Sequence, residues 1–510
     1  MAAAPPAAVE LRALSKRFGG VLANADVHLR VAAGTIHGIV GENGAGKSTA
    51  MKLLLGLLRP DSGEIFVHGQ PCIWASPAAA MARGLGMVHQ HFMLAGAYSA
   101  LDNILLGAEP VRGGMINRRQ ARTRLELLRQ QYGLPVDWDS PVERLPVGVQ
   151  QRIEILKLLY RDANILILDE PTAVLTPRET AELFANLRRL RNEGKTILLI
   201  THKLKEVMAI TDQVTVFRAG RVTGERVTAN TNPTELARLM VGRDVVLNLA
   251  VAPAKPQVGV ALEAADLHLA GPAVGGRTRL AQVSLQVRPG EIVGIAGVEG
   301  NGQSELLQAL LHPRDPRCRT SGTVRCLGQD VTHWEAGRIR ELGVALVPED
   351  RHREGLLLER PLRENFLLGW QRRSPFSRGG FLRPSALTSA AAAAVEEYDV
   401  RPADLGLAVG RLSGGNQQKL IFAREFQERP RLVIAAQPTR GVDVGAIEFI
   451  HRRLVRARDE GAGVLLVSFE IEEILALADR ILVLYEGRIT AEFARGEVSE
   501  AELGLKMGGS

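Results

Sequence analysis

The two halves of this 510-residue sequence repeat one another, and the repeat restricts the possible folds more than any other feature. Residues 34–41 read GTIHGIVG, and residues 290–297, which lie 256 positions later, read GEIVGIAG. Three further landmarks return 267 positions later: LPVGVQQR (145–152) as LSGGNQQK (412–419), LILDEPT (166–172) as VIAAQPT (433–439), and ITHK (200–203) as VSFE (467–470). The repeat predicts two homologous domains, 9–245 and 259–506, joined by a short linker at 246–258 that contains Ala, Pro and Lys.

Each copy alternates short apolar runs with helical patterns. In the first copy the run 165–168 follows a helix-like stretch at 152–159, and the run 196–200 precedes another at 203–208. This alternation is typical of an α/β fold with a largely parallel sheet.

A phosphate-binding loop is the clearest motif of the first copy. Residues 41–49, GENGAGKST, fit the pattern G-x-x-x-x-G-K-[ST] between an expected strand at 36–40 and an expected helix at 50–58. Lys47 can reach the β- and γ-phosphates, and the Ser48 hydroxyl can bind Mg²⁺. The predicted nucleotide-binding residues are Gly41, Glu42, Asn43, Gly44, Ala45, Gly46, Lys47, Ser48 and Thr49.

Four polar residues complete a candidate hydrolytic site. Asp169 and Glu170 follow the apolar run 165–168, where an aspartate can hold Mg²⁺ and a glutamate can act as general base. His202 follows the next run and can contact the γ-phosphate, and Gln90 follows the expected strand 85–88 and can contact metal and water. The prediction is therefore an ATPase in which Glu170, His202 and Gln90 are catalytic and Ser48, Gln90 and Asp169 bind Mg²⁺.

The segment LSGGNQQK resembles the signature sequence of ABC-transporter ATPases. The resemblance covers nearly the whole chain and is strongest to the tandem ATPase subunits of simple-sugar and nucleoside importers, above all to the nucleoside branch. It is carried further by MVHQHFML (87–94), EPTAVLTPRE (170–179), VPEDRHREG (347–355) and AAQPTRGVDVGAIEFIH (435–451). It implies two P-loop domains, each with a RecA-like, mostly parallel sheet, an antiparallel β subdomain and a helical subdomain that carries the signature.

The resemblance also implies how the site is assembled. The two domains would pair head to tail, within the chain or with a second copy, so that each ATP lies between the phosphate loop of one domain and the signature of the other. It assigns Phe18 to the adenine ring, and Ser413, Gly414, Gly415 and Asp443 to the nucleotide held by the first phosphate loop.

The second copy lacks the chemistry of the first. Gln303 replaces the lysine of its phosphate loop, GVEGNGQSE (297–305), and Glu349 stands where the first copy has Gln90. The counterparts of the aspartate, the glutamate and the histidine are Ala436, Gln437 and Phe469. An amide neither carries the lysine charge nor accepts a proton as a base.

The first copy has different losses. Its signature reads LPVGV (145–149), with Pro146 and Val147 in place of Ser and Gly, and Thr176 replaces the aspartate that the second copy keeps as Asp443. Under the head-to-tail pairing, one site would be complete and the other impaired throughout. Random loss of residues from one copy alone would not leave one interface intact and impair the other, so this distribution of losses supports the head-to-tail pairing.

Charge and hydrophobicity restrict the kinds of partner that the protein can have. The formal charge is +7, but no basic run carries interleaved aromatic residues, so nucleic acid is not expected as a partner. No apolar run approaches the roughly 20 residues that cross a bilayer, and the N-terminus lacks a signal peptide. The expected partners are membrane permease subunits, two in number, and through them a solute-binding protein, which places the chain at the cytoplasmic face of the membrane.

Two alternatives stay open. The solute could be a simple sugar of the ribose, galactose or xylose type instead of a nucleoside. A soluble ABC protein that acts on ribosomes or DNA is the more distant alternative. It is disfavoured by the short linker and by the presence of only three cysteines.

Overall fold

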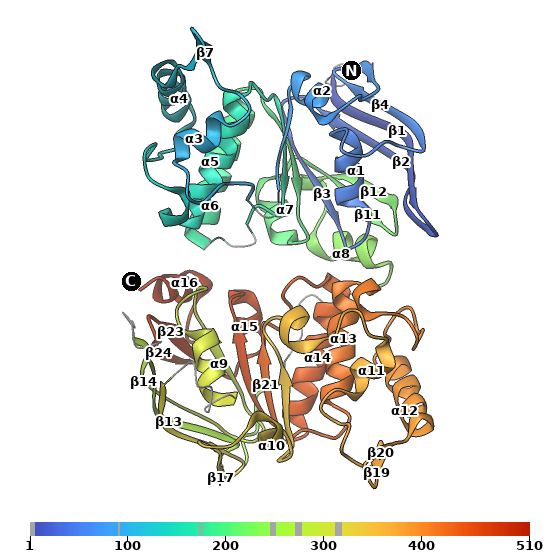
Figure 1. Ribbon diagram of the computed structural model, residues 1–510, viewed down its shortest axis with the longest axis vertical. Coiled ribbons are helices and arrows are strands. Elements are labelled where there is room, and N and C mark those ends of the chain that lie inside the picture. Colours follow the sequence, from blue (N-terminus) through green and yellow to red (C-terminus); the bar gives the residue numbers. More distant parts are fainter. Residues whose placement is uncertain are drawn as a thin grey trace. The chain divides into compact units, whose positions relative to one another are not determined.

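The chain divides into two compact units, Met1–Val245 and Val246–Ser510. The computed structural model describes residues 6–89, 92–172, 175, 177–244, 251–270, 278–311 and 319–509. Each unit is described separately below, and Figure 1 shows both.

The first unit is built on a six-stranded sheet of order β12-β11-β3-β10-β9-β6. The pairs from β11 to β6 are parallel, and only the edge pair of β11 with β12 is antiparallel. The strands are β3 (Ile36–Gly41), β6 (Leu85–Val88), β9 (Ile165–Asp169), β10 (Thr196–Ile200), β11 (Gln213–Arg218) and β12 (Arg221–Val227). The largely parallel sheet predicted from the alternating pattern is confirmed.

Two other layers cover the faces of this sheet (Figure 1). An antiparallel sheet of order β2-β1-β4-β5 lies on one side, and a helical lobe lies on the other. The antiparallel strands are β1 (Ala7–Phe18), β2 (Val21–Ala32), β4 (Ser62–Val67) and β5 (Gln70–Cys72). The helices are α1 (Lys47–Leu54), α2 (Pro77–Ala82), α3 (Ala100–Leu105), α4 (Arg118–Tyr132), α5 (Val147–Tyr160), α6 (Pro177–Asn192), α7 (Leu204–Ile210) and α8 (Pro233–Val241).

The apolar run of β9 explains the layering. Leu166 and Leu168 belong to the core that contains the helical lobe, whereas Ile165 and Ile167 belong to the core beneath the antiparallel sheet. Because successive strand side chains point to opposite faces, a strand buried on both faces must be apolar at every position. The continuous run at 165–168 meets this requirement.

The second unit repeats the arrangement. Its core sheet has the order β18-β21-β22-β15-β23-β24, and its antiparallel sheet has the order β14-β13-β16-β17. The core strands are β15 (Ile292–Ala296), β18 (Val344–Val347), β21 (Leu432–Ala436), β22 (Gly463–Ser468), β23 (Arg480–Tyr485) and β24 (Arg488–Ala494). The antiparallel strands are β13 (Leu262–Ala270), β14 (Thr278–Val287), β16 (Arg319–Cys326) and β17 (Gln329–Asp330).

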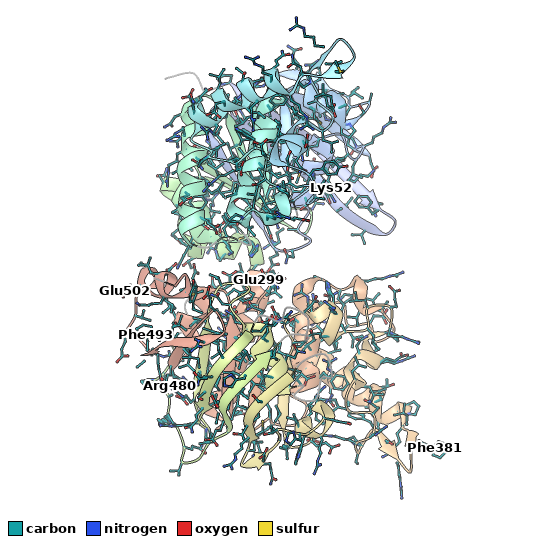
Figure 2. All side chains as sticks on the ribbon, turned by 60° about the vertical axis from the view of Figure 1, so that its left-hand side comes forward. Lys52, Glu299, Phe381, Arg480, Phe493 and Glu502 are labelled. Carbon is teal, nitrogen blue, oxygen red and sulfur yellow. The ribbon has the colours of Figure 1, made fainter. Side chains whose placement is uncertain are left out.

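The helices of the second unit also follow the order of the first. They are α9 (Gln303–Leu311), α10 (Ala336–Arg340), α11 (Leu362–Leu367), α12 (Pro384–Glu397), α13 (Gly414–Glu425), α14 (Val444–Asp459), α15 (Ile471–Leu477) and α16 (Glu500–Met507). Each helical lobe carries one small hairpin, β7 (Val111–Arg112) with β8 (Met115–Ile116) and β19 (Ser377–Arg378) with β20 (Phe381–Leu382). Phe381 projects from the second of these hairpins (Figure 2) and is 80% exposed.

No helix in the described part of the chain combines the length and the apolar character that crossing a bilayer requires.

Candidate nucleotide site

The phosphate loop of the first unit connects β3 to α1. Gly44 and Gly46 have φ values of 80° and 98°, in the left-handed region that favours glycine. A Cβ on Gly46 would lie 2.5 Å from the carbonyl oxygen of Ala23, so this turn also lacks room for a side chain. The helix begins at Lys47 and ends at Leu54, earlier at both ends than the predicted 50–58. A left-handed glycine, Gly56, follows its end.

The ammonium group of Lys47 lies inside this loop. Its Nζ donates hydrogen bonds to the carbonyl oxygens of Gly41 at 2.7 Å and Glu42 at 2.9 Å, and the residue is only 6% exposed. The helix N-terminus and this buried cation together favour an anion at the loop. Lys47 therefore lies where the sequence predicts a phosphate contact.

Ser48 and Asp169 form the candidate metal position. Ser48 is in the first turn of α1, Asp169 ends β9, and Ser48 Oγ lies 3.5 Å from Asp169 Oδ2. Burial and the neighbouring charge of Glu170 raise the pKa of Asp169 above its usual range. Within the described part of the chain, no group of three or more His, Cys, Asp or Glu side chains could hold a metal by itself. A hydroxyl and one carboxylate suit Mg²⁺, which takes its remaining ligands from phosphate and water.

Glu170 and His202 form a hydrogen-bonded pair. His202 Nδ1 lies 2.8 Å from Glu170 Oε1. Glu170 has a φ of 46°, and its backbone N–H donates to the carbonyl oxygen of Ile200 at 2.9 Å. Burial alone would raise the pKa of Glu170, but the hydrogen bond from His202 and the charges of His202 and Lys47 outweigh it and lower that pKa. The carboxylate is therefore kept ionised, as a general base requires.

A buried carboxylate that the sequence analysis missed lies behind this pair. Glu206 accepts hydrogen bonds from the hydroxyls of Thr172 and Thr201, the latter at 3.0 Å, and burial raises its pKa. These contacts join the chain after β9 to the chain after β10, and so support Glu170 and His202. The repeat contains the signal that could have found it, because Glu473 stands 267 positions later in the second unit.

The predicted adenine residue, Phe18, lies at the end of β1 and is about half exposed. It begins the turn of the β1–β2 hairpin, and this hairpin is tied to the phosphate loop by Asn24, whose Nδ2 donates to the Gly46 carbonyl oxygen at 3.1 Å. Gln90, predicted as a metal and water contact, lies outside the described residues.

The signature residues of the second unit lie close together. Ser413 caps the N-terminus of α13, where its hydroxyl accepts from the backbone N–H of Asn416 at 3.4 Å. A Cβ on Gly414 would lie 2.7 Å from the Gly441 carbonyl oxygen, and one on Gly415 would lie 2.7 Å from Asp443 Oδ2. Asp443 in turn caps α14 by accepting from the Ala446 N–H at 2.8 Å. The four predicted residues therefore lie together at the starts of two neighbouring helices, with Gly415 buried between them and Asp443.

The signature of the first unit has a different surface. Pro146 stands at the N-cap of α5 and makes no side-chain cap hydrogen bond. Val147, at the position of Gly414, is 38% exposed, so the first unit has an isopropyl group where the second unit has no side chain.

At the ends of β21 and β22, the second unit keeps the backbone of the site but not its chemistry. Gln437 has the same φ of 46° as Glu170, and its N–H donates to the Val467 carbonyl oxygen at 2.8 Å. Phe469, in the place of His202, offers only its backbone N–H to Gln437 Oε1, at 3.2 Å. A new contact appears between Ser304 Oγ and Glu349 Oε2, at 2.7 Å.

Fold and site together define a nucleotide-binding protein with two P-loop units. The family model described as ABC transporter matches residues 25–173 and 280–440. The chain belongs to the ABC transporter family and is an ATPase subunit of that family. The predicted fold of two tandem ABC domains is thereby confirmed.

Three curated relatives show where in the family the chain lies. It is 46% identical to the nucleoside import ATP-binding protein NupA of Lactococcus lactis, over 98% of both chains. It is 47% identical to the guanosine import ATP-binding protein NupO of Bacillus subtilis, over 98% of this chain and 97% of the relative. A ribose import ATP-binding protein RbsA of Rhodococcus jostii is 37% identical over 99% of both.

Proposed function

We propose that this chain is the ATP-hydrolysing subunit of a bacterial importer for nucleosides. Hydrolysis is supported by one observation above all, the Glu170–His202 pair beside the buried Lys47 in the first unit. The solute class is supported by the 46–47% identity to two full-length relatives that are named for nucleoside and guanosine import.

Binding is assigned to the first phosphate loop and its surroundings, residues 41–49. The Lys47 ammonium would exchange the carbonyl oxygens of Gly41 and Glu42 for phosphate oxygens, while Ser48 and Asp169 would hold Mg²⁺. Mg²⁺ would neutralise phosphate charge, and Phe18 would stack on the adenine ring. Gln90 completes this proposal as a further metal contact.

Glu170 would accept the proton of the attacking water. Its lowered pKa keeps the carboxylate ionised at neutral pH, and the hydrogen bond from His202 fixes its orientation. His202 and Lys47 would stabilise the charge that develops on the transferred phosphoryl group.

The signature of the second unit would complete the site. Ser413 and the backbone at Gly414 and Gly415 lie at the start of a 12-residue helix, α13, which suits a phosphate. Asp443 orders the neighbouring turn. The two domains, taken as 9–245 and 259–506 with the linker 246–258, would supply these parts head to tail, within one chain or with a second copy.

The partners follow from the importer role. Two permease subunits would hold the chain at the cytoplasmic face of the membrane, and through them the chain would work with a solute-binding protein. In the second unit, the segment 350–355 after β18 would connect such a partner with the signature, and two contacts support this role. Arg351 Nη1 donates to the Arg440 carbonyl oxygen at 2.6 Å, and His352 Nε2 lies 2.8 Å from Gln417 of α13.

The solute is tested by uptake. The chain, its permease subunits and its solute-binding protein would be expressed in cells that lack nucleoside uptake, and entry of radiolabelled guanosine and ribose would be measured. We expect guanosine entry that unlabelled nucleosides, but not ribose, compete away. Uptake of ribose alone would refute the nucleoside assignment and favour the second candidate, a simple-sugar importer, which the 37% identity to a ribose import protein supports.

A further inference from the structure

An arginine in the segment after β18 contacts two separate parts of the signature region of the second unit. Arg351 begins a short π-helical turn, Arg351–Gly355. Its Nη1 donates to the carbonyl oxygen of Arg440 at 2.6 Å, and its Nη2 donates to that of Gly441 at 3.3 Å. Its Nε donates to the side-chain oxygen of Gln417 at 3.3 Å. One guanidinium group therefore joins the turn before α14 to the first turn of α13.

The start of α13 leaves room for this guanidinium group. A Cβ on Gly414 would lie 2.7 Å from Arg351 Nη2 and 2.7 Å from the Gly441 carbonyl oxygen. A side chain at this position would displace the guanidinium group or the turn that it holds. The glycine of the signature and the arginine are therefore parts of one contact.

The first unit has neither part of this contact. Four residues after the end of β6 it has Phe92, whereas Arg351 stands four residues after the end of β18. A phenyl ring donates no hydrogen bond, and Val147 takes the position of Gly414. The arginine contact therefore belongs to the unit whose signature is assigned to the hydrolytic site.

A buried amide gives the arginine a fixed acceptor. Gln417 is 4% exposed, and its side-chain oxygen accepts from Arg351 and lies 2.8 Å from His352 Nε2. Because an amide oxygen only accepts hydrogen bonds, His352 carries its proton on Nε2 in this contact. The amide nitrogen of Gln417 donates to the Val409 carbonyl oxygen at 3.2 Å. With partners on both its oxygen and its nitrogen, this amide is held in one orientation.

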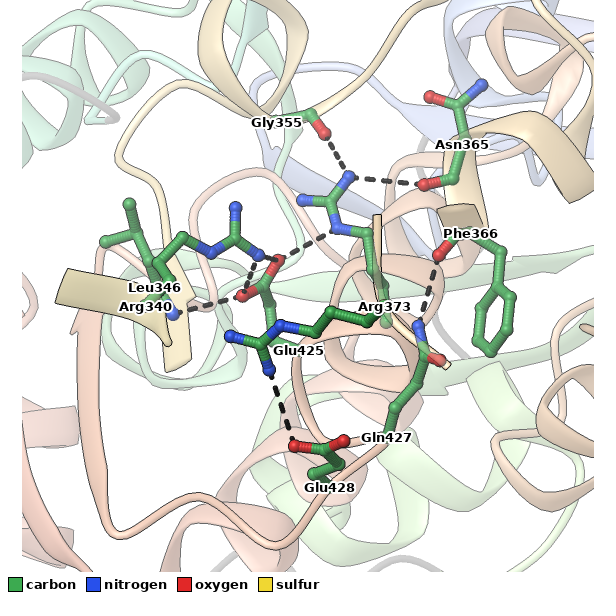
Figure 3. Close-up of polar contacts among 10 residues, drawn as sticks. Arg340, Leu346, Gly355, Asn365, Phe366, Arg373, Glu425, Gln427 and Glu428 are labelled. Carbon is green, nitrogen blue, oxygen red and sulfur yellow. Dashed lines mark hydrogen bonds and ion pairs between the residues drawn. The ribbon is translucent and has the colours of Figure 1, made fainter. Parts of the chain in front are cut away.

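A buried ionic cluster fixes the rest of the segment (Figure 3). Glu425 accepts from Arg340 Nη2 at 2.7 Å and from the backbone N–H of Leu346 in β18 at 3.2 Å. Arg424 donates from Nε to Glu425 at 2.8 Å and from Nη1 to the carbonyl oxygen of Gly355 at 2.7 Å. The chain is thus bound to the last turn of α13 both before and at the end of the π-helical turn, while the guanidinium group binds the first turn of the same helix.

We propose that Arg351 is a positioning residue for ATP hydrolysis at the first phosphate loop. It holds the turn before α14 against the start of α13, and so keeps Ser413 and the backbone of Gly414 in the arrangement that receives the terminal phosphate. The proposal rests on the proposed function, in which this signature completes the site of Glu170.

This role predicts an effect on kcat with little effect on KM. The contacts that bind ATP in the ground state come from the first unit, chiefly from residues 41–49. The signature would add its contacts as charge develops on the transferred phosphoryl group. Loss of an interaction that is made only in the transition state lowers kcat and kcat/KM equally and leaves KM unchanged.

The test measures ATP turnover of the assembled transporter with Arg351→Gln, both without solute and with guanosine and the solute-binding protein. We expect kcat to fall about tenfold or more in both conditions, with KM for ATP changed less than about threefold. Arg429→Gln, which removes an exposed arginine just after α13, is the matched control and should leave turnover unchanged. Thermal unfolding and co-purification with the permease subunits report whether each variant is folded and assembled.

Arg351→Lys distinguishes the geometry of the guanidinium group from its charge, and replaces Arg351→Gln if that variant does not fold. Lysine keeps the positive charge but has no planar fork that can donate to two carbonyl oxygens and to Gln417 at once. We expect its kcat to stay about fivefold or more below that of the unaltered transporter. A kcat equal to the unaltered value would contradict the positioning by the fork.

Glu170→Gln is measured in parallel, so that failure of this proposal can be told from failure of the proposed function. If Glu170→Gln abolishes turnover while the folded Arg351 variants hydrolyse ATP near the unaltered rate, the proposed function stands and the positioning role is wrong. A loss confined to the condition with guanosine would also overturn that role, because the segment would then only transmit a signal from the partner. Turnover near the unaltered rate in Glu170→Gln would refute the proposed function and the positioning role together.

Discussion

His202 Nδ1 and Glu170 Oε1 lie 2.8 Å apart at the ends of two neighbouring parallel strands, β10 and β9. The second unit builds the same two backbone positions, with Gln437 at the same φ, yet Phe469 can offer only its backbone N–H. The two units can therefore be compared directly, because they share this backbone arrangement. The first unit has a base and its histidine partner there, and the second unit has neither.

The His202 contact predicts a pH effect on hydrolysis. His202→Ala should lower turnover by about two orders of magnitude or more, because the base loses its orientation. The pKa of Glu170 should also rise, since its hydrogen bond from His202 lowers it now. Glu170 must be ionised to act, so the acid limb of the kcat profile should move to higher pH. An unchanged acid limb would show that His202 does not influence the ionisation of Glu170.

The signature residue Ser413 should be required although it lies in the second unit. Ser413→Arg, measured in the assembled transporter, should abolish ATP turnover, because the arginine would obstruct the start of α13. Pro146→Arg, at the corresponding place of the first unit, is the matched comparison and should have a much smaller effect. Equal losses in the two variants would contradict the idea that only one signature serves hydrolysis.

Burial of His37 predicts a dependence of stability on pH. His37 lies in β3, its Nε2 is 2.7 Å from Thr215 Oγ1, and burial lowers its pKa from 6.5 to about 4. Because the unfolded chain takes up a proton more readily, stability is complete above pH 6.5 and falls as the pH drops towards 4, by about 3 kcal/mol in all.

The variant that checks this effect is His37→Val with Thr215→Val, which removes both partners of the contact. The second unit has Val293 at the place of His37. The free energy of unfolding is measured with a chemical denaturant at pH 7 and at pH 5. Between these two values, the variant should lose about 2 kcal/mol less of it than the unaltered chain does. Parallel pH curves would show that His37 does not contribute.

The ionic cluster around Glu425 predicts non-additive effects on stability. Glu425→Leu leaves Arg340 and Arg424 facing a buried apolar group, and should cost about 3–5 kcal/mol of unfolding free energy. Adding Arg340→Met should recover part of this loss, because the first unit has Met81 and Leu158 at the corresponding places. Equal stabilities of the single and the double variant, measured by denaturant unfolding, would argue against coupling.

The fold could be predicted because its signals are local and repeated. The continuous run at 165–168 is apolar at every position because β9 is buried on both faces, and the strand 196–200 has the predicted ends. The bounds predicted for the helix after the phosphate loop, 50–58, are wrong. They were based on the apolar residues of this segment, whereas the helix starts at Lys47.

The contacts within the site were less predictable. The sequence identifies Lys47 and Glu170 by their motifs, but motifs do not reveal that Glu206 bonds to Thr172 and Thr201 beside the Glu170–His202 pair. The Ser304–Glu349 contact joins residues 45 positions apart through the sheet order, in which β18 and β15 are separated by two strands. Such pairings depend on which strand ends meet at one sheet edge, and a single sequence does not contain that information.

The central claim is that the first unit hydrolyses ATP with Glu170 as its base. The most direct measurement is steady-state ATP turnover of the assembled transporter with Glu170→Gln, beside Glu64→Gln, an exposed carboxylate of the same unit, as control. We predict a loss of about a hundredfold or more for Glu170→Gln with ATP still bound, and unchanged turnover for the control. Turnover near the unaltered rate in the Glu170→Gln transporter would contradict the account.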